Sequence, residues 1–355
     1  MAKDRARSRP TSKDVAALAG VSQSTVSYVL TGKRPISAET RRRVEDAMRQ
    51  LRFQPNAGAR ALRGRRTNVV ALVVRLSEQT DVADTVPYID TVVEEARRRD
   101  YDVVLVTGDE GADGLVRLAK RSICDAVVLM DIRGGDPRVE TAAGLGLPVV
   151  LIGTPDDSHG LAWVDFDSRK AGELLARELV DTGHRNIVLV SEVTQQQEQG
   201  FHFVSAFHAG VAETVAQGGL SLDVVRPTRS APMRFDVLPG DLFAKADDGG
   251  RLGVIARTPQ AIGIVAEAAT VRGLQVGRDV SLVGQCTDNV AESFRVPVTN
   301  VSPEPRDTSR SAMAVVFEQL ADEEWQGDLA HVVRPRPVTR RASTVVHTVI
   351  EPPTS

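Results

Sequence analysis

Cysteine, aromatic residues and long apolar runs are all scarce in this chain of 355 residues. Its two cysteines, Cys124 and Cys286, lie far apart and without metal-ligand spacing. This usage is typical of buried thiols in a reducing compartment and disfavours a disulfide framework. No apolar run approaches the ~18 residues that a membrane helix needs. The basic N-terminus, MAKDRARSRP, is not followed by the apolar segment of a secretory signal, so we expect a cytoplasmic protein without a membrane partner.

What is present is the composition of a globular protein, with 42% hydrophobic and 26% charged residues. The length predicts two or three domains, at ~100–200 residues per domain. We find no metal-ligand cluster, nucleophile elbow or Walker loop, so the sequence predicts neither a cofactor nor an enzyme. A solute-binding protein is the other alternative, and it would need an export signal.

Charge is distributed unevenly along the chain. Residues 1–66 hold 16 Lys/Arg and 5 Asp/Glu, a net charge of +11, whereas the remainder has a net charge of −14. A basic head on an acidic body is typical of a nucleic-acid-binding protein, because cationic side chains neutralise phosphates. The alternative is a solvated, disordered basic tail, which is the commoner meaning of a charge run.

The pattern inside the basic head predicts three short helices. Thr11 and Asp14 have the spacing of a capping box, and Gly20 ends the helix that they begin. Ser22 can cap a second helix, and a third is expected over residues 38–51. Two short helices joined through a glycine turn form a helix-turn-helix. The residues expected to share its core are Val15, Ala16, Leu18, Ala19, Val26, Val29, Leu30, Val44, Ala47, Met48 and Leu51.

The second helix is expected to present a polar face for reading base edges in the major groove. Glutamine suits adenine through a bidentate contact, and serine contacts several bases. Lysine and arginine after this helix would contact phosphates and set the register. The alternative is a small three-helix protein-binding module, which the basic excess disfavours. The predicted DNA-contacting residues are Thr11, Ser22, Gln23, Ser24, Thr25, Ser27, Tyr28, Lys33 and Arg34.

Three consecutive motifs of the head resemble those of a known family. They are Thr11-x-x-Asp-Val-Ala-x-x-Ala-Gly-Val-Ser-x-x-Thr-Val-Ser27, Ile36-Ser-x-x-Thr-Arg41 and Phe53-x-Pro-Asn56. Together they resemble the headpiece of the lactose-repressor (LacI/GalR) family of bacterial transcription regulators. The resemblance implies an all-α helix-turn-helix headpiece that binds double-stranded operator DNA.

The resemblance also implies a hinge segment that becomes helical on operator DNA. Residues 55–64 resemble that hinge, which makes Leu62 the side chain that wedges into the minor groove. Asn56 and Arg60 are the further DNA-binding residues that we expect here. Most relatives carry arginine at the position of Tyr28 and asparagine at that of Thr31, so we expect a half-site that differs from the commonest operator of the family.

The rest of the chain alternates apolar runs with amphipathic stretches, which predicts parallel sheets with helices on both faces. It resembles the periplasmic-binding-protein-like core of the same family, a doubly wound α/β structure with two lobes and a cleft between them. We expect a headpiece over residues 1–51, a hinge over 52–66 and a core over 67–355. The lobes are expected over about 67–162 plus 295–324, and about 163–294 plus 325–350.

Ligands of open α/β sheets bind beyond the carboxyl ends of the strands. Sugar-binding relatives typically carry an Asn-Asp pair where this chain has Arg257 and Thr258, and a Phe-Asp pair where it has Gln285 and Cys286. Two explanations are open, a different class of effector or a core without small-molecule control, and we favour the first. The effector-binding residues predicted at strand ends are Arg75, Asp131, Glu192, Arg257 and Gln285.

The resemblance implies a repressor that is controlled by an unknown small-molecule effector. A single headpiece buries little DNA surface, and cores of the family pair so that two heads reach two half-sites. The C-terminal residues 347–355 have no leucine heptads of the kind that form tetramers. We therefore expect a homodimer.

Overall fold

The computed structural model divides the chain into two compact units, Met1–Asn68 and Val69–Ser355. It describes residues 10–31, 34–51, 66–76, 82–107, 111–191, 200–230, 235–237, 242–243, 252–322 and 324–346. Five of the predicted binding residues lie outside these ranges, namely Lys33, Asn56, Arg60, Leu62 and Glu192.

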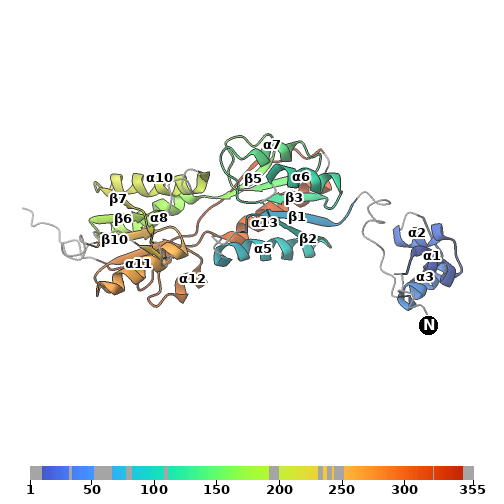
Figure 1. The fold of residues 1–355 in the computed structure, drawn as a ribbon, viewed down its shortest axis with the longest axis horizontal. Coiled ribbons are helices and arrows are strands. Elements are labelled where there is room, and N and C mark those ends of the chain that lie inside the picture. The colour runs from blue at the N-terminus through green and yellow to red at the C-terminus, as the bar shows by residue number, and fades with distance from the viewer. Residues whose placement is uncertain are drawn as a thin grey trace, which may run out of the picture. The chain divides into compact units, whose positions relative to one another are not determined.

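The described part of the first unit consists of the helices α1 (Ser12–Ala19), α2 (Gln23–Thr31) and α3 (Ala38–Gln50) (Figure 1). The predicted capping box is present, because the Thr11 N–H donates to Asp14 Oδ2 at 2.7 Å and the Asp14 N–H donates to Thr11 Oγ1 at 3.4 Å. These bonds satisfy amides that a helix start leaves free. The helix-turn-helix expected from the sequence is thus the local structure of this unit.

The core of the first unit consists of small and β-branched side chains. Val15, Val26 and Val44 are completely buried and bring the three helices together. The expectation that Leu18 shares this core is wrong, because its side chain is 47% exposed. Consecutive helical residues are rotated by about 100°, which turns Leu18 away from the stripe of Val15 and Ala19.

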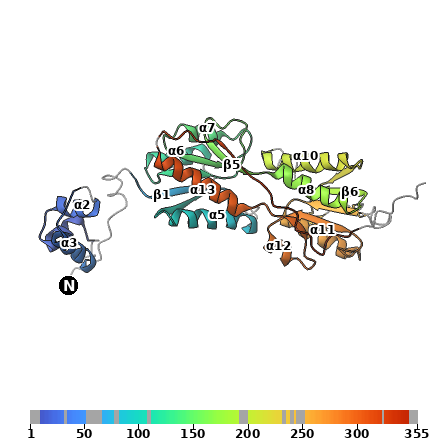
Figure 2. The same ribbon diagram turned by 180° about the vertical axis from the view of Figure 1, so that it is seen from behind.

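The second unit contains two parallel sheets (Figures 1 and 2). The first has the strand order β13-β5-β4-β3-β1-β2 and the second has the order β12-β11-β10-β6-β7. The first sheet comprises β1 (Val69–Val74), β2 (Asp102–Thr107), β3 (Ala126–Leu129), β4 (Val149–Ile152), β5 (Ala162–Phe166) and β13 (Ala330–Val333). The second comprises β6 (Asn186–Val190), β7 (Leu222–Val225), β10 (Leu252–Ala256), β11 (Ser281–Gln285) and β12 (Thr299–Val301). Separately, β8 (Thr228–Ser230) pairs antiparallel with β9 (Phe235–Val237).

Helices cover both faces of each sheet, which explains why central strands such as β1, β3, β4 and β10 are buried without alternation. In the first sheet, Leu72 packs with α5 and α13, whereas Ala71 packs with α6 and α7. In the second, Val254 packs with α11 and Ile255 with α8 and α10. The helices are α5 (Val82–Arg97), α6 (Gly111–Lys120), α7 (Pro137–Ala143), α8 (Ser168–Asp181), α10 (His202–Gln217), α11 (Pro259–Val271), α12 (Asp288–Ser293) and α13 (Pro305–Ala321).

The chain crosses between the sheets at other points than the sequence predicts. β5, mostly assigned to the second lobe, pairs with β4 in the first sheet. β13, also assigned to the second lobe, pairs with β5, and β12, assigned to the first, pairs with β11. An apolar pattern identifies a strand but not its partner, which is why these expected lobe limits need correction.

Two close approaches fix how helices pack in the second lobe. A Cβ atom on Gly172 of α8 would overlap the carbonyl oxygen of Phe207, and one on Gly210 of α10 would overlap that of Arg169. Glycine at both positions therefore lets the two helix backbones touch. In the described part of the chain, no helix combines the length and the apolar character needed to cross a bilayer.

Candidate DNA-binding face and candidate ligand cleft

A cluster of hydroxyl groups begins helix α2. The Thr25 N–H donates to Ser22 Oγ at 3.1 Å, so Ser22 caps the helix as the sequence predicts. The same oxygen lies 2.7 Å from Ser24 Oγ and 2.8 Å from Thr25 Oγ1. Ser22 and Ser24 are exposed, so these hydroxyl groups are available to a phosphate or a base edge.

The remaining described residues of the predicted face include an amide, an aromatic ring and a cation. Gln23 is exposed, and its Nε2 donates to Ser12 Oγ at 2.9 Å, which ties the amide to the start of α1. The Arg34 guanidinium lies 5.8 Å from the centroid of the half-buried Tyr28 ring. Ser27 is half-buried on the same helix. The arrangement presents one amide, several hydroxyls and a cation from neighbouring turns.

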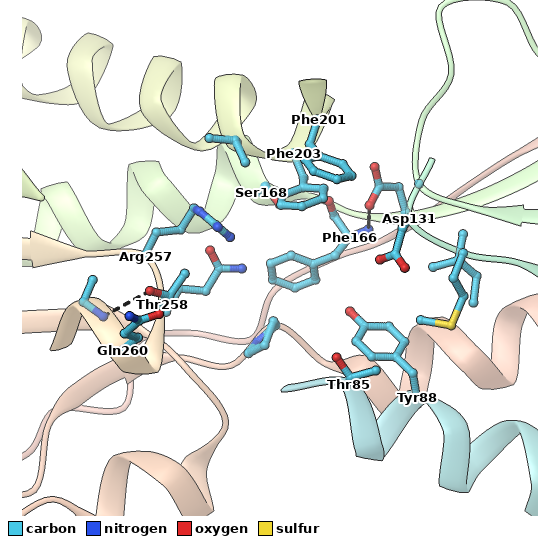
Figure 3. Close-up of a pocket in the computed structure, with 18 of the residues that line it drawn as sticks. Thr85, Tyr88, Asp131, Phe166, Ser168, Phe201, Phe203, Arg257, Thr258 and Gln260 are labelled. Atoms are coloured by element: carbon cyan, nitrogen blue, oxygen red, sulfur yellow. Dashed lines mark hydrogen bonds between the residues drawn. The ribbon is translucent and has the colours of Figure 1, made fainter. Parts of the chain in front are cut away.

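A cleft of about 400 Å³ lies where the carboxyl ends of strands from both sheets meet (Figure 3). Its volume is within the usual range of small-molecule sites, roughly 300–1,000 Å³. The first lobe supplies residues after β3, β4 and β5, and the second supplies residues from the ends of β6, β10 and β11. The lining includes Thr85, Tyr88, Asp131, Asp165, Phe166, Ser168, Ser191, Phe201, Phe203, Arg257, Thr258, Gln260 and Gln285.

Two carboxyl groups line the cleft on the first-lobe side. Asp131 Oδ2 accepts from the Arg75 backbone N–H at 2.9 Å, which links the ends of β3 and β1. The Asp165 carboxyl accepts from Thr154 Oγ1 and from the Phe166 N–H, each at 2.8 Å. Burial raises the pKa of Asp165 above its ordinary value, although these hydrogen bonds act in the opposite direction.

The second-lobe wall is formed by three neighbouring strands. Gln285 ends β11, Arg257 follows β10 and Ser191 follows β6, so the strand order places Arg257 between the other two. Among the described residues, Ser191 Oγ and Gln285 Oε1 are buried without a hydrogen-bond partner. Buried polar groups are rarely left unpaired in proteins, so both atoms are suited to contact a ligand.

Aromatic rings cover the space between the two walls. The rings of Phe201 and Phe203 stack with their centroids 5.1 Å apart. The Arg257 guanidinium lies 5.2 Å from the centroid of the Phe203 ring. Figure 3 shows the ring of Phe166 between the Arg257 side and the Asp131 side of the cleft, with Tyr88 on the Asp131 side. A ligand here would contact both apolar rings and charged groups.

The structure brings together three of the five predicted effector-binding residues, Asp131, Arg257 and Gln285. Arg75 does not line the described part of the cleft, and it contributes through its backbone N–H to Asp131. Its side chain lies close to the cations Arg133 and Arg138, and burial together with these charges lowers the pKa of Arg75.

Sequence reasoning missed other lining residues. Ser191 directly follows β6 and precedes Glu192, which lies outside the described residues. Asp165 stands directly before Phe166 at the end of β5, a position that the strand-end rule could have identified. Tyr88 comes from within α5 and Phe201 directly precedes α10, and neither position carries a signal in a strand pattern.

A buried ion pair supports the first-lobe side of the cleft. The side chains of Arg138 and Asp136 are 2% and 1% exposed, and Arg138 Nη2 lies 2.7 Å from Asp136 Oδ2. Arg138 Nη2 also donates to the carbonyl oxygen of Asp131 at 2.9 Å. Burial opposes ionisation of Asp136, but its bonds to Arg138 and the charge of that residue outweigh this effect and lower the pKa.

Three known protein families match parts of the chain, and the last two matches overlap over residues 176–221. Residues 11–56 match the bacterial regulatory proteins of the lacI family. Residues 68–221 match the periplasmic binding proteins and sugar binding domain of the LacI family. Residues 176–344 match the periplasmic binding protein-like domain.

Individual proteins are similar over nearly the same length. The HTH-type transcriptional regulator AglR of Rhizobium meliloti is 30% identical over 322 residues, 87% of this chain and 86% of that protein. The HTH-type transcriptional regulator CelR of Thermobifida fusca is 29% identical over 335 residues, 89% of this chain and 94% of that protein. Among solved structures, the lac repressor dimer bound to operator and the anti-inducer ONPF superposes on this chain with a TM-score of 0.76 at 20% sequence identity. The match covers 95% of this chain and 100% of that chain, and it supports the fold.

Proposed function

Because this chain belongs to the lacI family of bacterial regulatory proteins, we propose that it is a cytoplasmic repressor that binds a pseudo-palindromic operator as a homodimer. The observation that carries the proposal is the polar face of α2 on a capped helix-turn-helix. This face offers the exposed amide of Gln23 and the hydroxyls of Ser22 and Ser24. Such groups read base edges when the second helix of the motif enters the major groove.

The predicted DNA contacts fall into groups with different roles in this proposal. Gln23 and Tyr28 read bases, whereas Lys33 and Arg34 bind phosphates and supply the salt-dependent part of the affinity. Leu62 enters the minor groove and uses the deformability of the central step. The homodimer is part of the proposal because one headpiece contacts only one half-site, and two half-sites give the affinity that regulation needs.

Control by an unknown small-molecule effector in the core cleft is the second part of the proposal. It is supported by the cleft between the two lobes and by the unpaired buried atoms that line it. A ligand that prefers one arrangement of the lobes shifts the protein toward that arrangement and so changes its affinity for the operator. The coupling is reciprocal, so operator binding changes the affinity for the ligand by the same factor. The alternative is a regulator that is constitutive or is controlled by a non-sugar ligand or partner. This alternative is favoured by the presence of Arg257 and Thr258 where sugar-binding relatives carry an Asn-Asp pair.

Selection of the full-length protein against random duplex DNA, followed by sequencing of the retained molecules, tests the first part. We expect an enriched site with two inverted half-sites whose centres are one or more helical turns apart. Enrichment of a single half-site would contradict the dimer, and retention without any enrichment would contradict sequence-specific binding. The selected duplex then serves as the probe for the effector.

A further inference from the structure

We infer that the cleft takes a ligand with a carboxylate, which Arg257 binds, and a hydroxyl group at its other end, which Asp131 binds. This inference rests on the proposed function, in which the cleft is the effector site. It deepens that proposal by naming the chemical class of the effector, a hydroxylated acid. The evidence comes from the arrangement of charge on the two walls and from the unpaired atoms between them.

The second-lobe wall has the donors of a carboxylate site. Arg257 is the one cationic side chain among the described residues that line the cleft. It stands at the end of the central of three adjacent strands, with Ser191 on one side and Gln285 on the other. The Arg257 guanidinium and the neighbouring Ser191 hydroxyl can both donate to a carboxylate, whose two oxygens accept several hydrogen bonds.

The surroundings of Arg257 strengthen its attraction for an anion. The Phe203 ring lies 5.2 Å from its guanidinium carbon and excludes water from that direction. Charges attract more strongly where water is excluded. Among the described residues that the second lobe contributes to the lining there is no Asp or Glu, so the charge that these residues place on this wall is positive.

The unpaired atoms specify further groups on the ligand. Gln285 is 7% exposed and its Oε1 only accepts, so the ligand needs a hydroxyl or amine hydrogen beside its carboxylate. Ser191 is 2% exposed, and its hydroxyl can donate to a carboxylate oxygen. Both atoms therefore obtain partners from the same hydroxylated acid, whereas a wholly apolar ligand would leave them unpaired.

The first-lobe wall has the opposite character. Asp131 carries a carboxylate and Tyr88 a hydroxyl, and Figure 3 shows both across the Phe166 ring from Arg257. An acidic group here accepts from a ligand hydroxyl and repels a second carboxylate, which fixes the direction of the ligand. The aromatic rings between the two walls can pack against a flat apolar face of the ligand. A sugar acid and a phenolic acid share this chemistry.

Two pairs of probes test the inference, each an acid and the alcohol in which CH₂OH replaces the carboxylate. The sugar pair is D-glucuronate and D-glucose, and the phenolic pair is 4-hydroxyphenylacetate and 2-(4-hydroxyphenyl)ethanol. Isothermal titration of the full-length protein at low phosphate measures each affinity. We expect at least one acid to bind about tenfold or more tightly than its alcohol, the effect of one charge-assisted contact. The pair that responds identifies the source of the acid.

Single substitutions distinguish the effect of the Arg257 charge from an effect on folding. Arg257→Gln should remove the preference for the acid, whereas Arg257→Lys should retain part of it. The matched control is Arg272→Gln, because Arg272 lies 5.2 Å from the Phe243 ring centroid in the same lobe but does not line the cleft. The control should keep wild-type affinities. Equal binding of acid and alcohol, acid binding that survives in Arg257→Gln, or no acid binding at about 10 mM would each overturn the inference.

Operator binding measured with the same samples separates this inference from the proposed function. An alcohol that binds and changes operator affinity would leave the effector control standing and overturn the carboxylate. An acid that binds through Arg257 without changing operator affinity would support the carboxylate and contradict effector control.

Discussion

His202 Nε2 lies 2.7 Å from Asp156 Oδ1, which joins the start of α10 in the second lobe to the loop after β4 in the first. Two further contacts run beside this one. The Gly134 N–H donates to the Gly200 carbonyl at 3.3 Å, and the Arg133 guanidinium lies 5.0 Å from the Phe201 ring centroid. The lobes are therefore connected by side-chain and backbone contacts next to the cleft, in addition to the crossing chain segments.

The His202 and Asp156 pair should couple the lobes only weakly, since the side chains are 43% and 64% exposed. A double-mutant cycle with His202→Ala and Asp156→Ala should give a coupling free energy of about 0.5 kcal/mol in denaturant unfolding. The control is Asp157→Ala, because Asp157 lies near His159 instead, at 3.8 Å. A coupling of His202 to Asp157 as large as that to Asp156 would refute the pair.

Gly210→Ala should be strongly destabilising because its methyl group would overlap the Arg169 carbonyl oxygen where α8 and α10 touch. We expect a loss of about 3 kcal/mol or more in the free energy of unfolding, the magnitude of an overpacked core. The control is Gly263→Ala in α11, whose methyl would lie 3.9 Å from the Phe294 ring. That change should be neutral or stabilising by up to about 1 kcal/mol. Similar effects at the two glycines would contradict the helix contact.

Arg138→Met should leave the Asp136 carboxylate buried without its cation. The expected cost is about 3–5 kcal/mol at neutral pH, and the double variant Arg138→Met with Asp136→Asn should recover part of it. The pKa of Asp136 is lowered in the folded protein, so its contribution to stability is complete above its ordinary pKa and declines as pH falls through the folded value. Urea unfolding between pH 3 and pH 7 should show this decline in the wild type but not in the double variant.

Cys124 should be unreactive in the folded protein. It is 6% exposed, and burial raises the pKa of its thiol to about 11. Because the unfolded thiol ionises at a lower pH, this group lowers the free energy of unfolding progressively between its ordinary pKa and about 11. A thiol reagent at pH 8 should label Cys124 only after denaturant is added, with the labelled residue identified by mass spectrometry. Rapid labelling of Cys124 without denaturant would contradict its burial.

In the proposed binding mode, Leu62 wedges into a deformable central step of the operator. Leu62→Ala should therefore lower affinity for the selected operator while leaving non-specific affinity largely unchanged. The matched comparison is Lys33→Ala, which should weaken binding to all sequences and reduce the salt dependence by about one phosphate contact. Competition titrations against the operator and against random duplex DNA measure both quantities. An unchanged ratio of specific to non-specific affinity in Leu62→Ala would exclude the wedge.

Local signals in the sequence predicted local structure well. The capping box at Thr11 depends on residues three apart, and the structure contains both of its hydrogen bonds. Strand ends likewise identified Asp131 and Arg257, because parallel strands bring their carboxyl ends to one edge. Leu18 was mistaken because the width of a buried stripe depends on the neighbouring helices, which a single helix pattern does not contain.

Long-range relationships were predicted less well. Nothing in the four residues of β13 indicates that it pairs with β5, 167 residues earlier in the chain, where Ala330 pairs with Trp163. Phe201 and Phe203 do not follow a strand, and only their position beside the second sheet makes them part of the cleft. Contacts between distant elements depend on the path of the chain, which is encoded by many weak preferences together.

The late position of α13 and β13 has a consequence for synthesis on the ribosome. The first sheet begins with β1 at Val69, but α13, which packs with Leu72, ends at Ala321 and the edge strand β13 ends at Val333. At roughly 5–20 residues per second, elongation separates these elements by more than about ten seconds. During that interval the apolar face of β1 has no α13 to cover it. A nascent or prematurely terminated chain therefore exposes apolar surface in the first lobe, and only chains that extend beyond Val333 can complete its sheet.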